Sequence, residues 1–286
     1  MLGQYYKEKL ILIDKTNFKS DEACSLSLFI SQSFFIFSIS SQNYANLLQL
    51  CHIEFTNLAN GETLTEKITF LLNNYQLPQK KFQKITISVL NKDFTILPEA
   101  YSNPNDLKEF LTFSSGLAEV KNVKAQSIKN VKFCYAIDEE LIQYLEKTFT
   151  RAMIKHSGTI NLDLFFSNHS LIKSNLFLSI NDGLIEIAAK ENNELLFYNV
   201  FNYDNNEDVL YYILFMMEQF NLNSLQTKLS ISGQIKTNDA LILSIKKYIK
   251  HVNFVAHDPS LKLEGEFSEL PSHFYFTLLN QHLCAL

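Results

Sequence analysis

Residues 25–38, SLSLFISQSFFIFS, and residues 176–188, LFLSINDGLIEIA, decide the fold of this chain. In each stretch, apolar residues alternate on both sides of a short polar tip, which is the pattern of a β-hairpin. The tips are Ser31-Gln32-Ser33 and Asn181-Asp182-Gly183. They lie 150 residues apart (Gln32 against Asp182), so the sequence predicts that one hairpin occurs twice.

The elements that follow each hairpin also repeat. The sequence predicts a third strand, a capped helix and a fourth strand after each tip. In the first copy these are the strand 46–55, the helix capped by Thr63 with Glu66, and the strand 84–89. In the second copy they are the strand 195–201, the helix capped by Asn205 with Asp208, and the strand 228–232. The fold class is therefore α/β, built from duplicated β-β-β-α-β units. We expect two lobes, residues 1–150 and 151–286, with no long linker between them.

Further strands and helices lie between and after the copies. They are a helix from Asn103-Pro104 through Phe110, a strand at 131–137, a helix capped by Asp138, a strand at 151–156, a helix at 160–171, a helix at 240–249 and a strand at 252–256. Lys121, Lys124, Lys129 and Lys132 form an acid-free basic stretch. Its expected structure is an edge strand with solvated lysines; the alternative is contact with RNA or an acidic partner.

Composition excludes several classes of protein. A net charge of −5 differs from that of a dedicated nucleic-acid binder, which is usually strongly basic. The first ten residues carry charges and tyrosines where a signal peptide needs an apolar core. The longest apolar run, residues 209–217, is far shorter than the roughly 20 residues that span a bilayer. We expect a cytoplasmic protein with no membrane insertion and with reduced cysteines.

No catalytic or metal-binding motif is present in the sequence. The seven glycines are dispersed, so neither the Walker phosphate loop nor the dinucleotide fingerprint can form. The histidines lack the spacing of a zinc site, and there is no nucleophile elbow. In the pair Cys51-His52, adjacent strand residues point to opposite faces, so the two side chains cannot act together.

Five further stretches connect the chain to a known family. They are residues 94–98 (FTILP), 132–137 (KFCYAI), 195–199 (LLFYN), 229–233 (LSISG) and 270–274 (LPSHF). In these strings, and over nearly its full length, the chain resembles a Bacteroidetes family of unknown function with an actin-like ATPase, ribonuclease-H-like fold. The order of elements between the copies also resembles that of the actin-like protein of type IV pilus assembly.

The resemblance implies a site between the two lobes. In actin-like ATPases a nucleotide lies in this cleft, each first hairpin holds phosphate with an Asp-x-Gly loop, and a Gly-Gly pair holds the adenosine. The corresponding residues here are the candidate cofactor-binding residues, with ATP as the candidate ligand: Ser31, Gln32, Ser33, Asp182, Gly183, Ser232 and Gly233. The first loop has lost the carboxylate that would hold a metal, which argues against ATP hydrolysis.

Each candidate also has a purely structural interpretation. Asp-Gly is the usual pair of a tight hairpin turn, a polar tip such as Ser31-Gln32-Ser33 needs no ligand, and Gly233 marks a close approach of two backbones. Two functions follow. The first is a non-catalytic scaffold or partner-binding protein whose apolar tail, residues 274–286, packs on its own lobe or on a partner. The alternative is a nucleotide-binding protein that uses the inter-lobe cleft.

Overall fold

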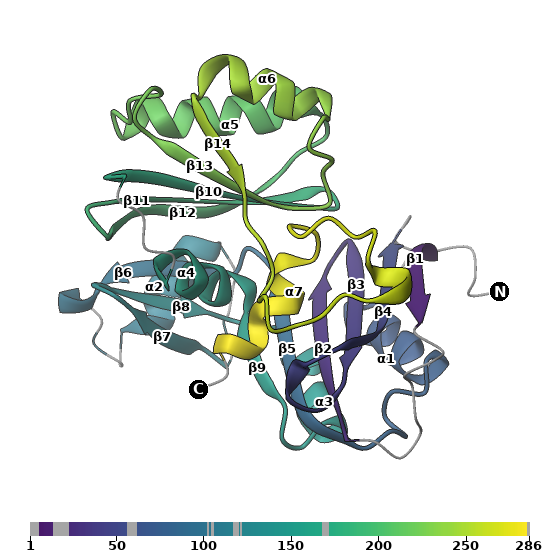
Figure 1. Ribbon diagram of the computed structural model, residues 1–286. Coiled ribbons are helices and arrows are strands. Elements are labelled where there is room, and N and C mark those ends of the chain that lie inside the picture. Colours follow the sequence, from purple (N-terminus) through teal and green to yellow (C-terminus); the bar gives the residue numbers. More distant parts are fainter. Residues whose placement is uncertain are drawn as a thin grey trace.

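Two mixed β-sheets form the centres of the two lobes in the computed structural model (Figure 1). The structure describes residues 6–13, 23–55, 62–101, 103, 106–116, 120, 122–167 and 172–284. The first sheet has the order β1 (Tyr6–Ile13), β4 (Leu47–Phe55), β3 (Phe34–Ser40), β2 (Cys24–Ser31), β5 (Phe82–Leu90), β9 (Met153–His156). The second has the order β12 (Glu194–Asn202), β11 (Leu184–Glu191), β10 (Ser174–Asn181), β13 (Lys228–Gly233), β14 (His251–Phe254).

The predicted duplication is confirmed in the strand order. Strands β4-β3-β2-β5-β9 of the first sheet correspond one by one to β12-β11-β10-β13-β14 of the second. Both hairpins are antiparallel and have two-residue turns, and each first strand pairs in parallel with the strand that follows the helix. The repeat also extends beyond the predicted unit, because β5 pairs in parallel with β9 as β13 does with β14.

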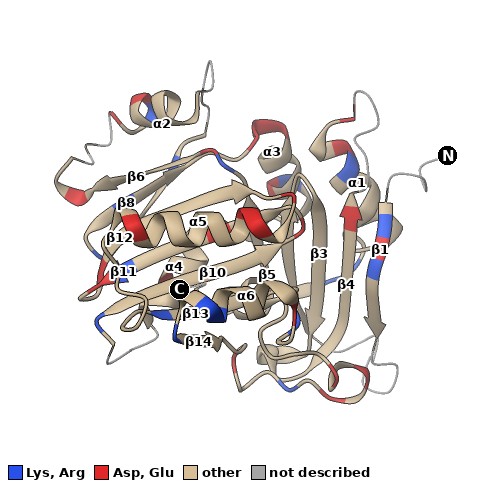
Figure 2. Ribbon diagram, turned by 90° about the horizontal axis from the view of Figure 1, so that it is seen from above, with Lys and Arg blue, Asp and Glu red and all other residues tan. Residues whose placement is uncertain are grey.

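The helices of the two copies also correspond. They are α1 (Leu64–Asn74) and α3 (Glu139–Thr148) in the first copy, and α5 (Asn206–Gln219) and α6 (Ala240–Tyr248) in the second. Thr63 and Asn205 form the predicted capping boxes, and the Asp138 side chain accepts a hydrogen bond from Leu141 N–H at 3.0 Å. The acidic residues in the first turns of α3 and α5 complement the helix dipoles (Figure 2).

The first copy carries two additions. Strand β1 extends its sheet beyond β4, and a small sheet of β6 (Phe94–Pro98), β8 (Val131–Tyr135) and β7 (Lys124–Ile128) is inserted before α3. The basic stretch lies here and β7 is an edge strand, as predicted, although Lys121 is outside the described residues. Carboxylates from other segments accompany it: Lys124 lies 3.5 Å from Glu146, and Lys132 lies 3.2 Å from Glu99.

The predicted helix start at Asn103 is wrong, and Pro104 lies outside the described residues. Helix α2 (Leu107–Ser115) has Asp106 as its N-cap residue. Asp106 N–H donates to the Asn103 carbonyl at 3.0 Å and closes a turn before the helix, and the first helical bond runs from Phe110 N–H to the Asp106 carbonyl at 3.1 Å. A left-handed Gly116 ends the helix.

The second sheet is covered on both faces. Residues such as Leu176 and Ile187 point to α5 and α6 and form one core cluster with them. Their neighbours Phe177 and Ala188 point the other way and join the core of the first lobe. Figure 1 shows α4 (Ser157–Ser167) and α7 (Phe276–Asn280) between the two sheets. The last four residues of the helix predicted at 160–171 lie outside the described residues.

The C-terminal tail packs on its own chain. Helix α7 is buried, and a 3-10 turn, Gln281–Cys284, follows it. The Gln281 amide donates to the carbonyls of Leu28 at 3.3 Å and Thr86 at 3.0 Å, on adjacent strands of the first sheet. The tail therefore joins the first lobe after the chain has passed through the second. Among the described residues, no helix is long and apolar enough to cross a membrane.

Candidate functional site

The first hairpin tip is held by its own hydroxyl group. Ser31 is fully buried, and its Oγ accepts hydrogen bonds from the backbone N–H of Ser33 at 3.0 Å and of Phe34 at 3.1 Å. Gln32 is exposed at the turn. The Ser31 hydroxyl thus replaces a backbone acceptor inside the turn, which makes a two-residue connection possible without glycine.

The second tip is fixed by glycine and by a tyrosine. Gly183 has a φ of 69°, in the left-handed region that this turn requires. Tyr203 follows β12; its hydroxyl donates to the Asn181 carbonyl at 3.0 Å, and its N–H donates to the Gly183 carbonyl at 3.2 Å. The turn is therefore bonded to the next strand of its own sheet on both sides of Asp182.

The two tips meet at Asp182. Ser33 Oγ donates to the Asp182 backbone carbonyl at 2.6 Å, which joins one lobe to the other directly. The Asp182 carboxylate contacts the Lys9 ammonium through Oδ1 and lies 2.7 Å from His52 Nε2 through Oδ2. His52 Nδ1 lies 3.2 Å from the Tyr275 hydroxyl. We call these five residues the tip cluster.

Electrostatics in the tip cluster favour an ionised Asp182. Burial alone would raise the pKa of this carboxyl, but the hydrogen bonds and charges of His52 and Lys9 outweigh it and hold the pKa below its usual value. An ionised carboxylate can only accept, so His52 Nε2 must carry a proton and donate. Burial and the nearby Asp182 charge raise the pKa of Tyr275, so its hydroxyl stays protonated. Each side chain of the tip cluster therefore has a hydrogen-bond or ion-pair partner within the cluster.

The third predicted segment, Ser232-Gly233, ends β13 beside β10. Gly233 has a φ of 100°, and a Cβ there would lie 1.9 Å from the Ile180 carbonyl oxygen. The Gly233 N–H donates to the His273 carbonyl at 3.0 Å. Ser232 is fully buried, and its Oγ has no hydrogen-bond partner among the residues that the structure describes. The need for glycine at 233 is thus explained by the approach of two backbones.

Sequence reasoning identified the two tips but not the residues that join them. Lys9, His52 and Tyr275 come from β1, β4 and the turn before α7, far apart in the chain. The one available signal was strand alternation at Cys51-His52. The prediction that these side chains point apart is confirmed, since Cys51 contacts Tyr75 while His52 faces Asp182.

The residues at the tips do not fit a magnesium-triphosphate group. A phosphate loop needs free N–H groups, and a metal needs a carboxylate that is available to it. Here the Ser33 and Phe34 N–H groups are bonded to Ser31, and Asp182 already holds Lys9 and His52. Within the described part of the chain, no three His, Cys, Asp or Glu side chains are grouped so that they could hold a metal ion. The assignment of the seven predicted residues to a cofactor stays a prediction.

A second polar cluster lies deep between the lobes. Glu186 of β11 is fully buried and accepts hydrogen bonds from Tyr198 at 2.7 Å, Asn161 at 2.9 Å and Ser157 at 3.2 Å. Asn161 in turn accepts from the Thr277 hydroxyl at 2.9 Å. Burial raises the pKa of Glu186 by more than the three hydrogen bonds lower it. The cluster ties the second sheet to α4 and α7.

The chain matches a protein family and several solved structures. The family model described as "Protein of unknown function (DUF3822)" matches residues 13–252. No curated protein sequence matches the chain. A solved structure from Bacteroides thetaiotaomicron VPI-5482, described as a protein with actin-like ATPase fold and unknown function, is 21% identical with a TM-score of 0.72. The match covers 85% of this chain and 94% of that one.

A second solved structure is one chain of the PilM-PilN type IV pilus biogenesis complex. It is 12% identical, has a TM-score of 0.60, and the match covers 91% of this chain and 97% of that one. At these identities the likeness concerns the fold. The two mixed sheets and their flanking helices are those of the actin-like ATPase fold.

Proposed function

We propose that this chain, which belongs to the DUF3822 family of proteins of unknown function, is a non-catalytic scaffold or partner-binding protein that uses the actin-like fold as a rigid frame. The observation that carries the proposal is the direct bond between the tips, from Ser33 Oγ to the Asp182 carbonyl at 2.6 Å. The resemblance to actin-like ATPases would place nucleotide phosphates between these two tips. A phosphate there would have to break this bond and compete with Asp182 for Lys9.

The charges at the tips also support this proposal. The first tip contributes hydroxyl and amide groups but no carboxylate of its own, and the nearby Glu54 carboxylate lies 3.5 Å from the Lys9 ammonium. Asp182 on the other side brings a negative charge toward any phosphate, and Lys9 already compensates it. The similar chain from the PilM-PilN complex supports the partner-binding part, because that fold occurs there in a complex with another protein.

The test is nucleotide binding, measured by thermal unfolding with 1 mM ATP or ADP, with and without Mg²⁺, and by phosphate release. We expect no shift in Tm and no hydrolysis. A site filled about 100-fold above its Kd would stabilise the protein by about 2.7 kcal/mol, which is easily measured. If nucleotide raises the Tm of the wild type and of the Lys7→Ala control but not that of Lys9→Ala, the tips bind nucleotide and the scaffold proposal is wrong.

A further inference from the structure

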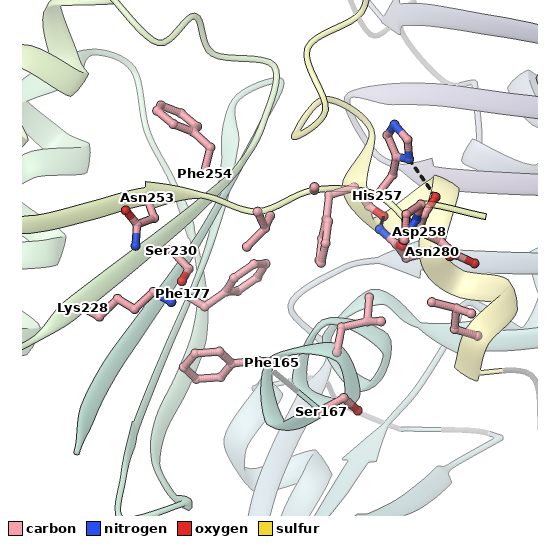
Figure 3. Close-up of a pocket in the computed structure, with 16 residues that line it drawn as sticks. Phe165, Ser167, Phe177, Lys228, Ser230, Asn253, Phe254, His257, Asp258 and Asn280 are labelled. Carbon is pink, nitrogen blue, oxygen red and sulfur yellow. Dashed lines mark hydrogen bonds between the residues drawn. The ribbon is translucent and has the colours of Figure 1, made fainter. Parts of the chain in front are cut away.

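A groove lies between the second sheet and the helices α4 and α7. Its first cavity, of about 410 Å³, begins at the row Phe177, Ser230 and Asn253, which are partners across β10, β13 and β14. Figure 3 shows this row facing Asp258 and Asn280 on the opposite wall. The row lies in the first halves of β10 and β13, whereas the tip cluster lies beyond their ends. The groove is thus separate from the tips.

A second cavity, of about 660 Å³, adjoins the first. Both are lined by Leu164, Ser167 and Leu283, so the two cavities are adjacent, and we call them together the lysine groove. Two consecutive phenylalanines of α4 divide it, since Phe165 lines the first cavity and Phe166 lines the second. The apolar floor of the groove is thus the pair of Phe165 and Phe166 rings, and polar residues such as Gln126 and Asp163 line the second cavity beside them.

Four lysines surround this apolar floor. Lys228 lines the first cavity, and Lys129 and Lys155 line the second. The buried Lys190 ammonium lies 4.5 Å from the Phe165 ring centre and 5.1 Å from that of Phe166. Burial lowers the pKa of Lys190, and the positive charges of Lys129 and Lys228 lower it further, so these cations act on one another.

The carboxylates of the groove offset this charge only in part. Asp163 accepts from Gln126 at 2.8 Å; burial raises the pKa of this carboxyl, while Gln126 and the positive charges of Lys155 and Lys129 lower it. The Asp258 carboxylate accepts a hydrogen bond from the Ser260 hydroxyl at 2.6 Å and lies 3.3 Å from His282 Nε2. The negative end of α4 is also compensated, because Lys190 donates to the Phe165 carbonyl at 2.6 Å.

Two lysines of the groove remain available to a ligand. Within the described part of the chain, no carboxylate oxygen lies within 4.0 Å of the ammonium of Lys129 or Lys228. Lys129 is exposed and Lys228 half-buried, one at each cavity. Two positive charges thus flank an apolar floor, an arrangement that suits an anion with an apolar part.

We propose that the lysine groove binds a short acidic segment of a partner protein, with a bulky apolar side chain of that segment in the first cavity. The inference rests on the proposed partner-binding function and names the chemistry of the partner. Strand β14 lines the groove and, among the residues that the structure describes, pairs with β13 alone, so its other edge can accept an extended peptide. The chain as a whole carries −5; this local positive charge therefore fits a short acidic segment better than a long polyanion such as RNA.

The experiment is selection from a phage-displayed library of random dodecapeptides on the intact protein. We expect enriched peptides with several Asp or Glu residues and an aromatic or aliphatic residue. Their Kd should rise at least tenfold for the double variant Lys129→Glu/Lys228→Glu and should rise with salt. The matched variant Lys81→Glu/Lys236→Glu makes the same change in net charge at exposed lysines elsewhere and should bind as the wild type does.

Hydrogen exchange on the wild type keeps the test independent of variant stability. Bound peptide should slow exchange in β14 and in the turn at residues 129–130. Peptides without acidic residues, equal binding to the groove variant, protection elsewhere or no enrichment would each overturn the inference. Acidic peptides that bind elsewhere would leave the partner-binding function standing, whereas nucleotide binding at the tips would remove that function itself.

Discussion

Gly233 has a φ of 100°, and its neighbour across the sheet, Ile180, leaves no room for a side chain. Gly183 has a similar φ of 69°, yet among the described residues no atom beyond its two chain neighbours lies within 4 Å of the position that its Cβ would take. The two glycines therefore separate two physical reasons for the same residue type. Gly183 is needed for conformation alone, and Gly233 for conformation and close packing.

Replacing Gly233 should be far more costly than replacing Gly183. For Gly183→Ala we expect a loss of about 1 kcal/mol in the free energy of unfolding, from left-handed strain. For Gly233→Ala the clash with the Ile180 carbonyl adds to the strain, and we expect a loss of about 3 kcal/mol or more. Urea unfolding followed by circular dichroism measures both variants. Equal losses would contradict the packing argument.

Among the helices, the N-terminal caps are features that nearby residues in the sequence predict. The Asn205 side chain accepts from Asp208 N–H at 2.9 Å, and the Asp208 side chain accepts from Asn205 N–H at 3.3 Å. This reciprocal pair is what the spacing Asn-x-x-Asp predicts, because all its atoms belong to one turn. Helix α2 began elsewhere than predicted, since Asn103 closes a separate turn before Asp106.

Removing the cap of α5 should weaken the protein by an amount typical of one cap. For Asn205→Ala we expect a loss of about 1 kcal/mol, because the Asp208 N–H loses its acceptor. The neighbouring variant Asn206→Ala is the control, since Asn206 is exposed in the first turn and should change stability little. Thermal or urea unfolding compares them, and an equal effect of the two changes would show that the cap is not responsible.

Over the whole molecule, the buried Glu186 cluster should make the contact between the lobes sensitive to pH. The pKa of Glu186 is raised in the folded state, so the folded protein binds its proton more tightly than the unfolded chain does. The free energy that protonated Glu186 contributes to folding is fully present below about pH 4.3, the pKa of the carboxyl in the unfolded chain. It is lost as the pH rises through the higher pKa of the folded protein. Glu186→Gln cannot ionise and should lose that dependence.

The measurement is the free energy of unfolding of wild type and Glu186→Gln from pH 5 to pH 8. We expect the free energy of unfolding of Glu186→Gln to increase relative to that of the wild type as pH rises. Glu194→Gln, on an exposed carboxyl in the same sheet, is the control and should show a flat difference. A flat difference for Glu186→Gln as well would mean that the carboxyl ionises as freely in the folded protein as in the unfolded chain.

Local sequence patterns were enough to predict the duplicated hairpins, the third and fourth strands and the capped helices, and five short stretches carried the actin-like resemblance. Alternation, caps and turn residues act within a few positions along the chain, so they can be read locally. The bond from Ser33 to Asp182, the burial of Glu186 and the lysine groove could not be predicted from such local patterns. The bond from Ser33 to Asp182 joins residues 149 positions apart, Asn161 of the Glu186 cluster bonds to Thr277 116 positions away, and the groove is lined by segments between Gln126 and Cys284. Only the folding of one sheet against the other brings these segments together.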